Sequence, residues 1–224
     1  MAKIKFRLNT ISNQKLRDPV IKYIGANNFK KLSKEEGELK ALNVYQKRKL
    51  TKREIGLKYE RYLQFYFETK GNWDVYNNGI RKGYKDLGRD LICIKNNTVR
   101  IIQAKYWSVS KKIYSKHIHQ LHGSAASYKY CKNNFQDYNI QKYFCFRNQI
   151  DEEAKKQAKY LDIKLKKIEM PKLYPMIKCN ISKRGKKYFL PFDSYYDQVK
   201  ISKDKGEFYC SEPIQAIKSG FIRS

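Results

Sequence analysis

The sequence predicts an α/β fold: a mixed sheet flanked by helices, followed by a small α+β C-terminal module. Residues 90–168 alternate strand-like and helix-like patterns, beginning with a hairpin. Beyond Pro171 and Pro175, short strand-like runs end in one helix. A chain of 224 residues has room for one or two domains with a real core. We expect a basic, mainly helical N-terminal extension at 1–50, the main domain at 51–170 and the module at 176–224.

The first fifty residues are basic and only weakly patterned. Its beginning has few apolar residues among five cationic side chains, which are Lys3, Lys5, Arg7, Lys15 and Arg17. Further along, Ser33 is placed to cap a short helix. This segment is either an extension that contacts a DNA backbone or merely a solvated basic arm. Both interpretations stay open.

A long helix begins at Thr51, which forms a capping box with Glu54. We expect it to run to about Thr69 and to be closed by Gly71. Its buried stripe consists of four residues at helical spacing: Ile55, Tyr59, Leu63 and Tyr66. Glu60 falls on the edge of that stripe, at the boundary between core and solvent. The alternative is an ordinary edge Glu paired with Arg61 or Gln64.

The next segment leads from this helix to the hairpin. Residues 73–76 are typical of a short strand, 77–79 of a turn, and 81–88 of a glycine-punctuated loop. Asp86 lies four residues ahead of Asp90. It is either an accessory acid or, more simply, the cap of this loop.

The hairpin at 90–105 brings three polar side chains together. Side chains alternate between the two faces of a strand, so Gln103 and Lys105 point the same way. Asp90 begins the first strand, and residues 96–98 supply the turn. A carboxylate, an amide and an ammonium therefore converge at one end, which suits metal-assisted phosphodiester hydrolysis. The alternative is a pair of solvated strand caps.

A helix is expected at 115–130, after a polar basic stretch. Its histidines His117, His119 and His122 lack a well-spaced further ligand, which disfavours zinc. Lys116 or His119 is better explained as a phosphate contact. A buried strand at 140–146, a helix capped by Asp151 and a strand at 163–168 follow.

The C-terminal module is expected to contain four elements. These are a hairpin at 178–190, strands at 196–201 and 207–210, and a helix that starts after Ser211 and ends at Gly220.

The charge and the cysteine content limit the kinds of function that the chain can have. The chain carries 49 Lys and Arg against 21 Asp and Glu, a net charge of +28, which implies a polyanionic partner and nucleic acid first. Membrane binding has little support, because no stretch approaches eighteen apolar residues. The five scattered cysteines are typical of reduced thiols, and they are Cys93, Cys131, Cys145, Cys179 and Cys210. We therefore expect an unexported, cytoplasmic protein.

The motifs Gly88-Arg89-Asp90-Leu91 and Gln103-Ala104-Lys105 resemble those of the PD-(D/E)xK nuclease superfamily, and more closely its Mrr-like restriction endonuclease branch. That branch often has Gln in place of the second acid. The Gly56-Leu-Lys-Tyr-Glu60 run resembles its helical acid motif. The resemblance covers roughly residues 50–170 and implies a restriction-endonuclease-like fold. The last 48 or so residues resemble a small accessory domain appended to bacterial nucleases.

The resemblance implies a Mg²⁺-dependent endonuclease that hydrolyses DNA, related to restriction or to mobile elements, with Mn²⁺ as a substitute ion. Asp90, Gln103 and Glu60 would position the metal, with the Ala104 carbonyl as a further ligand. Lys105 would orient or deprotonate the attacking water and stabilise the pentacovalent phosphate, leaving 5′-phosphate and 3′-hydroxyl ends. The expected contacts to DNA are cationic residues and one histidine around this site: Lys82, Lys85, Lys111, Lys116 and His119.

Two other functions stay open. A Holliday-junction-resolvase-like enzyme shares this core but requires a homodimer with two sites spaced across a junction. A non-catalytic nucleic-acid-binding protein would keep the charge and lose the site.

Overall fold

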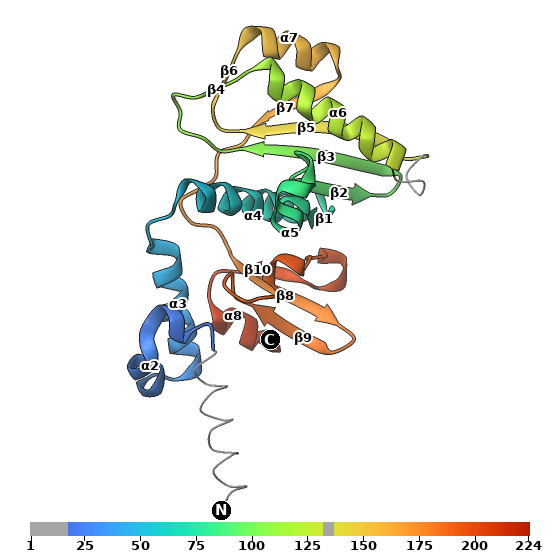
Figure 1. The fold of residues 1–224 in the computed structure, drawn as a ribbon. Helices are drawn as coiled ribbons and strands as arrows, with labels where there is room; N and C mark the ends of the chain where they lie inside the picture. Colours follow the sequence, from blue (N-terminus) through green and yellow to red (C-terminus); the bar gives the residue numbers. More distant parts are fainter. Residues whose placement is uncertain (1–17, 132–136) are drawn as a thin grey trace, which may run out of the picture. The chain divides into compact units, whose positions relative to one another are not determined.

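The computed structural model describes residues 18–131 and 137–224 (Figure 1). The basic residues expected to form an N-terminal arm, Lys3 to Arg17, lie outside this part, as do the side chains of Lys82 and Lys85. The described residues form two compact units. The smaller comprises the described part of Met1–Lys49 together with Pro175–Tyr196 and Tyr209–Ser224, and the larger comprises Leu50–Tyr174 and Asp197–Phe208.

The larger unit is built on a five-stranded mixed sheet with the order β1-β2-β3-β5-β7 (Figure 1). Strands β1, β2 and β3 are antiparallel neighbours, whereas β3, β5 and β7 are parallel. The strands are β1 Asp74–Asn77, β2 Leu91–Lys95, β3 Thr98–Lys105, β5 Asn139–Phe146 and β7 Ile163–Lys167. The predicted mixed α/β architecture is confirmed, and the β2–β3 hairpin lies within it.

Helices cover both faces of this sheet (Figure 1). Helix α4 (Lys52–Gly71) packs on one face, where Leu63 and Ile102 belong to one buried cluster. Helices α6 (Ser115–Cys131) and α7 (Glu152–Tyr160) pack on the other, where Ile101 belongs to a second cluster. The side chains of adjacent residues of β3 thus pack in cores on opposite faces of the sheet, as the predicted alternation requires.

The ends of these helices follow local side-chain chemistry. Thr51 Oγ1 accepts a hydrogen bond from the Glu54 N–H at 3.3 Å, completing the predicted capping box. Asp151 caps α7 as predicted, accepting from the Glu153 N–H at 3.1 Å. At the end of α4 the prediction was wrong by one residue: Asn72, at φ 50°, is the left-handed cap rather than Gly71.

Two predicted segments around the hairpin differ from the structure. In place of a turn and an irregular loop, residues 78–86 form a short helix α5 (Asn78–Lys82) and the 3₁₀ turn η1 (Gly83–Asp86). Strand β3 ends at Lys105 because the Trp107 N–H donates to the Asn148 side chain at 3.1 Å instead of continuing the ladder. Short strands β4 (Lys112–Ile113) and β6 (Gln149–Ile150) pair next to this point.

The smaller unit joins two N-terminal helices to a C-terminal sheet, although the sequence predicts separate parts for these ranges. A buried contact across 150 residues explains the association: the Tyr188 hydroxyl donates to Glu38, whose carboxylate also pairs with Arg223 at 3.2 Å. No local pattern signals such a contact.

The sheet of the smaller unit has the order β10-β8-β9-β11. The predicted hairpin is present as β8 and β9, whereas the strand predicted at 196–201 is wrong, since residues 196–198 form a 3₁₀ turn. The elements are α2 Ile21–Lys31, α3 Lys34–Lys47, β8 Ile177–Ser182, β9 Gly185–Phe189, η3 Tyr196–Gln198, β10 Phe208–Cys210, α8 Pro213–Lys218 and β11 Ile222–Arg223. The 3₁₀ turn η4 (Lys203–Lys205) belongs to the larger unit.

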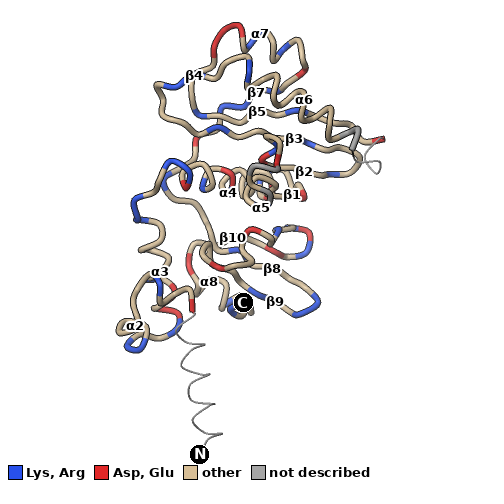
Figure 2. Tube along the Cα trace, in the orientation of Figure 1, with Lys and Arg blue, Asp and Glu red and all other residues tan. Residues whose placement is uncertain are grey.

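Lys and Arg recur along both units (Figure 2). Within residues 18–131 and 137–224, no helix combines the length and apolar character that crossing a membrane requires.

Candidate active site

Asp90 is held in place by the strand beside it. Its N–H donates to the Ile102 carbonyl at 2.9 Å, and its Oδ2 accepts from the Ala104 N–H at 2.6 Å. The side chain is 7% exposed. The second strand of the hairpin therefore orients the acid at the start of the first.

Glu60 reaches this acid across Gly79. The Gly79 N–H donates to the Asp90 carbonyl at 2.8 Å. A Cβ on Gly79 would lie 2.6 Å from Glu60 Oε2 and 3.3 Å from Asp90 Cα. Only a glycine here leaves the Glu60 carboxyl where it is. The structure thus brings together an acid from α4 and the acid of the hairpin.

Burial and neighbouring charges raise the pKa values of both carboxyls. Burial, reinforced by the charges of Asp90 and Asp86, raises the pKa of Glu60 to about 9. Burial also raises the pKa of Asp90 to about 6, against the opposing effects of Lys105 and the Ala104 N–H. Without a cation, the site therefore retains protons at pH values where free carboxyls are ionised.

Asp86 caps the loop, as one of the two interpretations predicted, and its role as an accessory acid stays a prediction. Its Oδ1 accepts from the Gly88 N–H at 2.7 Å and so caps the loop. Its carboxylate also contributes to the raised pKa values of Glu60 and Asp90.

Two buried oxygen atoms of the predicted ligands lack hydrogen-bond partners among the described residues: Glu60 Oε2 and Gln103 Oε1. Gln103 is fully buried, and its Nε2 donates to Gln120 Oε1 of α6 at 3.0 Å. An unpartnered buried oxygen is costly, so such atoms call for an explanation. Carboxylate and amide oxygens without partners are suitable ligands for Mg²⁺ or a similar hard cation.

Lys105 lies close enough to both acids for its charge to lower the pKa of each. Its Nζ is 5.9 Å from the centroid of the Trp107 ring, and the Nζ of Lys111 is 5.6 Å from the same centroid. Of the predicted DNA contacts, Lys111 thus shares an aromatic neighbour with Lys105. Lys116 and His119 are exposed on α6.

Within residues 18–131 and 137–224, no group of three or more His, Cys, Asp or Glu side chains is arranged to hold a metal ion. The ligand set of two carboxylates and one amide, from Asp90, Glu60 and Gln103, stays a prediction. The contact made by Ala104 is through its N–H, and a role for its carbonyl stays a prediction.

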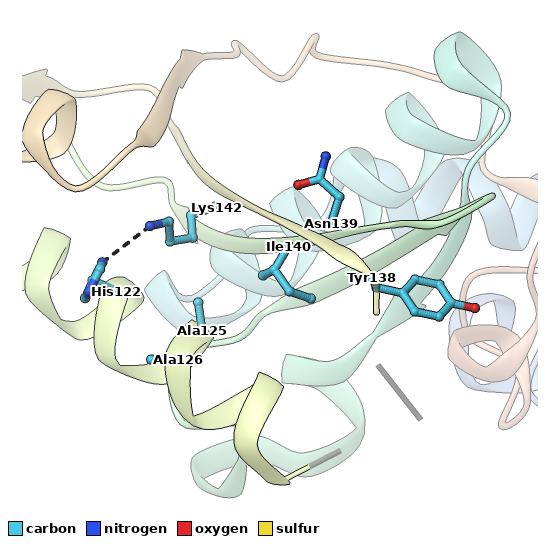
Figure 3. A pocket seen from close by; sticks show the side chains of 7 residues that line it. All are labelled: His122, Ala125, Ala126, Tyr138, Asn139, Ile140 and Lys142. Carbon is cyan, nitrogen blue, oxygen red and sulfur yellow. Dashed lines mark hydrogen bonds between the residues drawn. The ribbon is translucent and has the colours of Figure 1, made fainter. Parts of the chain in front are cut away.

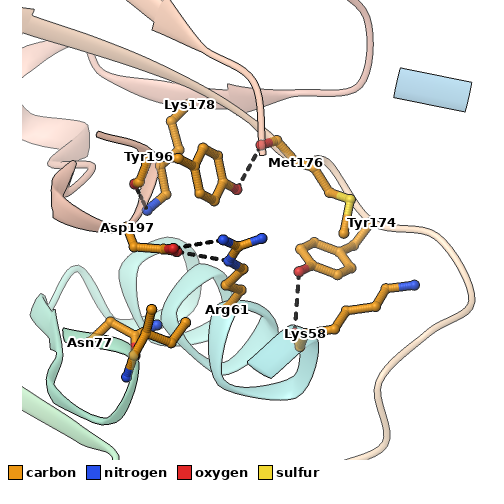
Figure 4. A network of polar contacts seen from close by, with 9 residues as sticks. Lys58, Arg61, Asn77, Tyr174, Met176, Lys178, Tyr196 and Asp197 are labelled. Carbon is orange, nitrogen blue, oxygen red and sulfur yellow. Dashed lines mark hydrogen bonds and ion pairs between the residues drawn. The ribbon is translucent and has the colours of Figure 1, made fainter. Parts of the chain in front are cut away.

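The helix that carries Glu60 is anchored by its next residue. Arg61 donates from Nε and Nη2 to the two carboxylate oxygens of Asp197, at 2.7 and 2.6 Å (Figure 4). The Tyr174 hydroxyl donates to the Lys58 carbonyl on the same helix at 3.5 Å (Figure 4). These contacts fix the position of the α4 turn around Glu60.

Sequence reasoning missed Gly79 and Gln120. Gly79 was assigned to a turn, although its φ is not positive, and its role is to leave space for Glu60. Gln120 lies one helical turn after Lys116 and carries no motif. Nothing local distinguishes it, because its partner Gln103 is seventeen residues away on another element.

A separate hollow lies at the other end of β3 and β5, between β5 and α6 (Figure 3). It measures about 350 Å³ and is lined by His122, Ala125, Ala126, Tyr138, Asn139, Ile140 and Lys142. Lys142 Nζ lies 3.4 Å from His122 Nδ1, and burial together with this cation lowers the pKa of His122.

Comparisons with known proteins found limited similarity. No family model and no curated protein matches the chain. Two solved structures are similar at 14% identity: a protein of unknown function (TM-score 0.36, covering 47% of this chain and 56% of that one) and a repair endonuclease from Pyrococcus abyssi (TM-score 0.37, covering 55% and 50%). The chain spans about half the length of each.

Proposed function

We propose that the larger unit is a divalent-metal-dependent endonuclease that hydrolyses DNA phosphodiester bonds. The observation that carries this proposal is the meeting of Glu60 and Asp90 at Gly79, with Glu60 Oε2 buried and without a hydrogen-bond partner among the described residues. On the motif residues Asp90, Gln103 and Lys105, we further assign the unit to the PD-(D/E)xK superfamily and its Mrr-like branch, with a role in restriction or on mobile elements.

Asp90, Glu60 and Gln103 would hold Mg²⁺, with Mn²⁺ as a substitute. A bound divalent cation supplies Lewis acidity at the scissile phosphate and lowers the pKa of a water molecule that it binds. The raised pKa values of Asp90 and Glu60 support this role, since carboxyls that repel one another in a buried place are stabilised by a cation.

Lys105 supplies the positive side chain of the site. It lies near both carboxyls. Its ammonium can donate a hydrogen bond to an attacking water and can stabilise the negative charge that develops on the pentacovalent phosphate. Lys105 ends β3 and directly follows Ala104, whose N–H binds Asp90. The same strand therefore positions the Lys105 side chain and the Asp90 carboxylate.

The net charge of +28 supports a polyanionic substrate. Lys111, Lys116 and His119 are exposed on the segment that follows Lys105 and on α6, and they would contact the phosphates that flank the cleaved bond. Lys82 and Lys85 stay proposals from the sequence.

Nicking of supercoiled plasmid in Mg²⁺ and in EDTA tests the proposal. We expect Mg²⁺-dependent nicking that falls at least about 100-fold in Asp90→Asn and Lys105→Met. Asn can still accept from the Ala104 N–H, so the hairpin should be preserved. Lys159→Met, at an exposed position of α7, is the matched control and should retain activity. Equal nicking by all variants would contradict the roles of Asp90 and Lys105, and no nicking by the wild type would contradict the proposal and favour a binding protein.

A further inference from the structure

Gln103 is an ambiguous metal ligand, because an amide presents an oxygen at one end and an NH₂ group at the other. Only the oxygen can bind a cation. Turned by 180°, the same side chain would direct two N–H donors at the site. When that oxygen binds a cation, the buried NH₂ end of Gln103 needs a hydrogen-bond acceptor that stabilises this orientation.

Gln120 of α6 is placed to do this. Its Oε1 accepts from Gln103 Nε2 at 3.0 Å, so the NH₂ end of Gln103 is taken and its Oε1 is left without a partner among the described residues. The two amides meet over Gly88, where a Cβ would lie 2.9 Å from Gln103 Nε2 and 3.1 Å from Gln120 Nε2. Gly88, at φ 78°, precedes the Arg89-Asp90 pair.

We infer that Gln120 is a positioning residue that orients the Gln103 amide with its oxygen toward the cation. This inference rests on the proposed function, because it presumes that Gln103 is a ligand. Gln120 itself is exposed and lies on the surface turn of α6, so its replacement should leave the core of the larger unit unchanged.

Binding of Mn²⁺ to the full chain, measured by electron paramagnetic resonance, tests the inference without relying on activity. Gln120→Leu removes the acceptor and should weaken Mn²⁺ binding about 10-fold, the usual effect of losing a partner that orients a ligand. Gln120→Glu can only accept hydrogen bonds and should bind Mn²⁺ at least as tightly as the wild type. Thermal unfolding of both variants checks that the fold is kept.

A second background makes the test specific. In Gln103→Glu, the ligand offers an oxygen at either end, so orientation no longer matters. Adding Gln120→Leu to this variant should change Mn²⁺ affinity less than 2-fold. A 10-fold loss in both backgrounds would overturn the inference, since it would indicate a general structural role.

The outcomes also separate the two proposals. If the wild type binds Mn²⁺ and nicks DNA but Gln120→Leu binds Mn²⁺ unchanged, only the role of Gln120 fails. If the wild type neither binds Mn²⁺ nor nicks DNA, both proposals fail.

Discussion

Asp90 Oδ2 accepts a hydrogen bond from the Ala104 N–H at 2.6 Å, so the strand that carries Gln103 and Lys105 also orients the acid at the start of the hairpin. A single hairpin thereby sets the relative positions of three of the four proposed site residues. The fourth, Glu60, comes from α4 and depends on contacts outside the hairpin.

The pH dependence of stability tests the environment of Glu60. Its pKa is about 9 in the folded protein and near 4.5 when exposed, so the folded state keeps a proton that the unfolded state loses. Stability from this group is complete below about pH 4.5 and is lost as the pH rises through about 9. In EDTA at pH 8, Glu60→Gln should therefore be more stable than the wild type. Its Tm should rise by about 2–4 °C for each kcal/mol gained in the free energy of unfolding.

The measurement is thermal unfolding in EDTA from pH 5 to pH 10. Glu169→Gln, at an exposed position, is the control and should follow the wild type. The environment assigned to Glu60 would be wrong if the wild type and Glu60→Gln lost stability equally as the pH rose.

Gly79→Ala tests the space through which Glu60 meets Asp90. The new Cβ would lie 2.6 Å from Glu60 Oε2, the free end of a flexible side chain, and 3.3 Å from Asp90 Cα, so the carboxylate should move and the Asp90 backbone should shift slightly while the fold persists. We expect nicking to fall at least about 10-fold, with little change in Tm.

Gly37→Ala is the matched control for this substitution. Gly37 lies in α3 of the smaller unit, where a Cβ would meet Ile24 and Val20 at ordinary contact distances of 3.6 and 3.9 Å. Unchanged nicking by Gly79→Ala would show that the position of Glu60 does not matter.

Arg61→Met tests the anchor of α4. It leaves Asp197 without its bidentate partner, and we expect a loss of about 1–2 kcal/mol for this partly exposed pair. Urea unfolding of the two single variants and of Arg61→Met with Asp197→Asn would isolate their coupling. Strict additivity would show that the pair contributes nothing.

Salt dependence tests the DNA contacts. Affinity for duplex DNA, measured by fluorescence anisotropy in EDTA, should fall steeply with salt, and Lys116→Ala should reduce the slope of log K against log salt by about one. Lys159→Ala on α7 should leave the slope unchanged. An equal effect of both variants would mean that binding is diffuse and not centred on α6.

Much of the fold could be predicted from local signals. Capping by Thr51 and Asp151 marks two helix starts, and alternation of side chains defines β3, whose Ile101 and Ile102 enter opposite cores. These features depend on residues close in sequence, so a single chain reveals them.

The parts that could not be predicted depend on distant partners. Residues 78–86 are helical because Asn77 caps them and Gly79 hydrogen-bonds to Asp90, although their composition favours a loop. Gln120 gains its role only through Gln103, and Glu38 associates with a sheet 150 residues away. The spacing of apolar residues along the sequence does not indicate such distant pairs.

The most direct test of the central claim, that Glu60, Asp90 and Gln103 form one cation site, is anomalous diffraction from crystals soaked in Mn²⁺. We predict a peak in contact with oxygens of all three side chains, absent from crystals of Asp90→Asn. The claim would be contradicted by crystals in which Mn²⁺ occupies other residues while Glu60 Oε2 and Gln103 Oε1 stay without a metal.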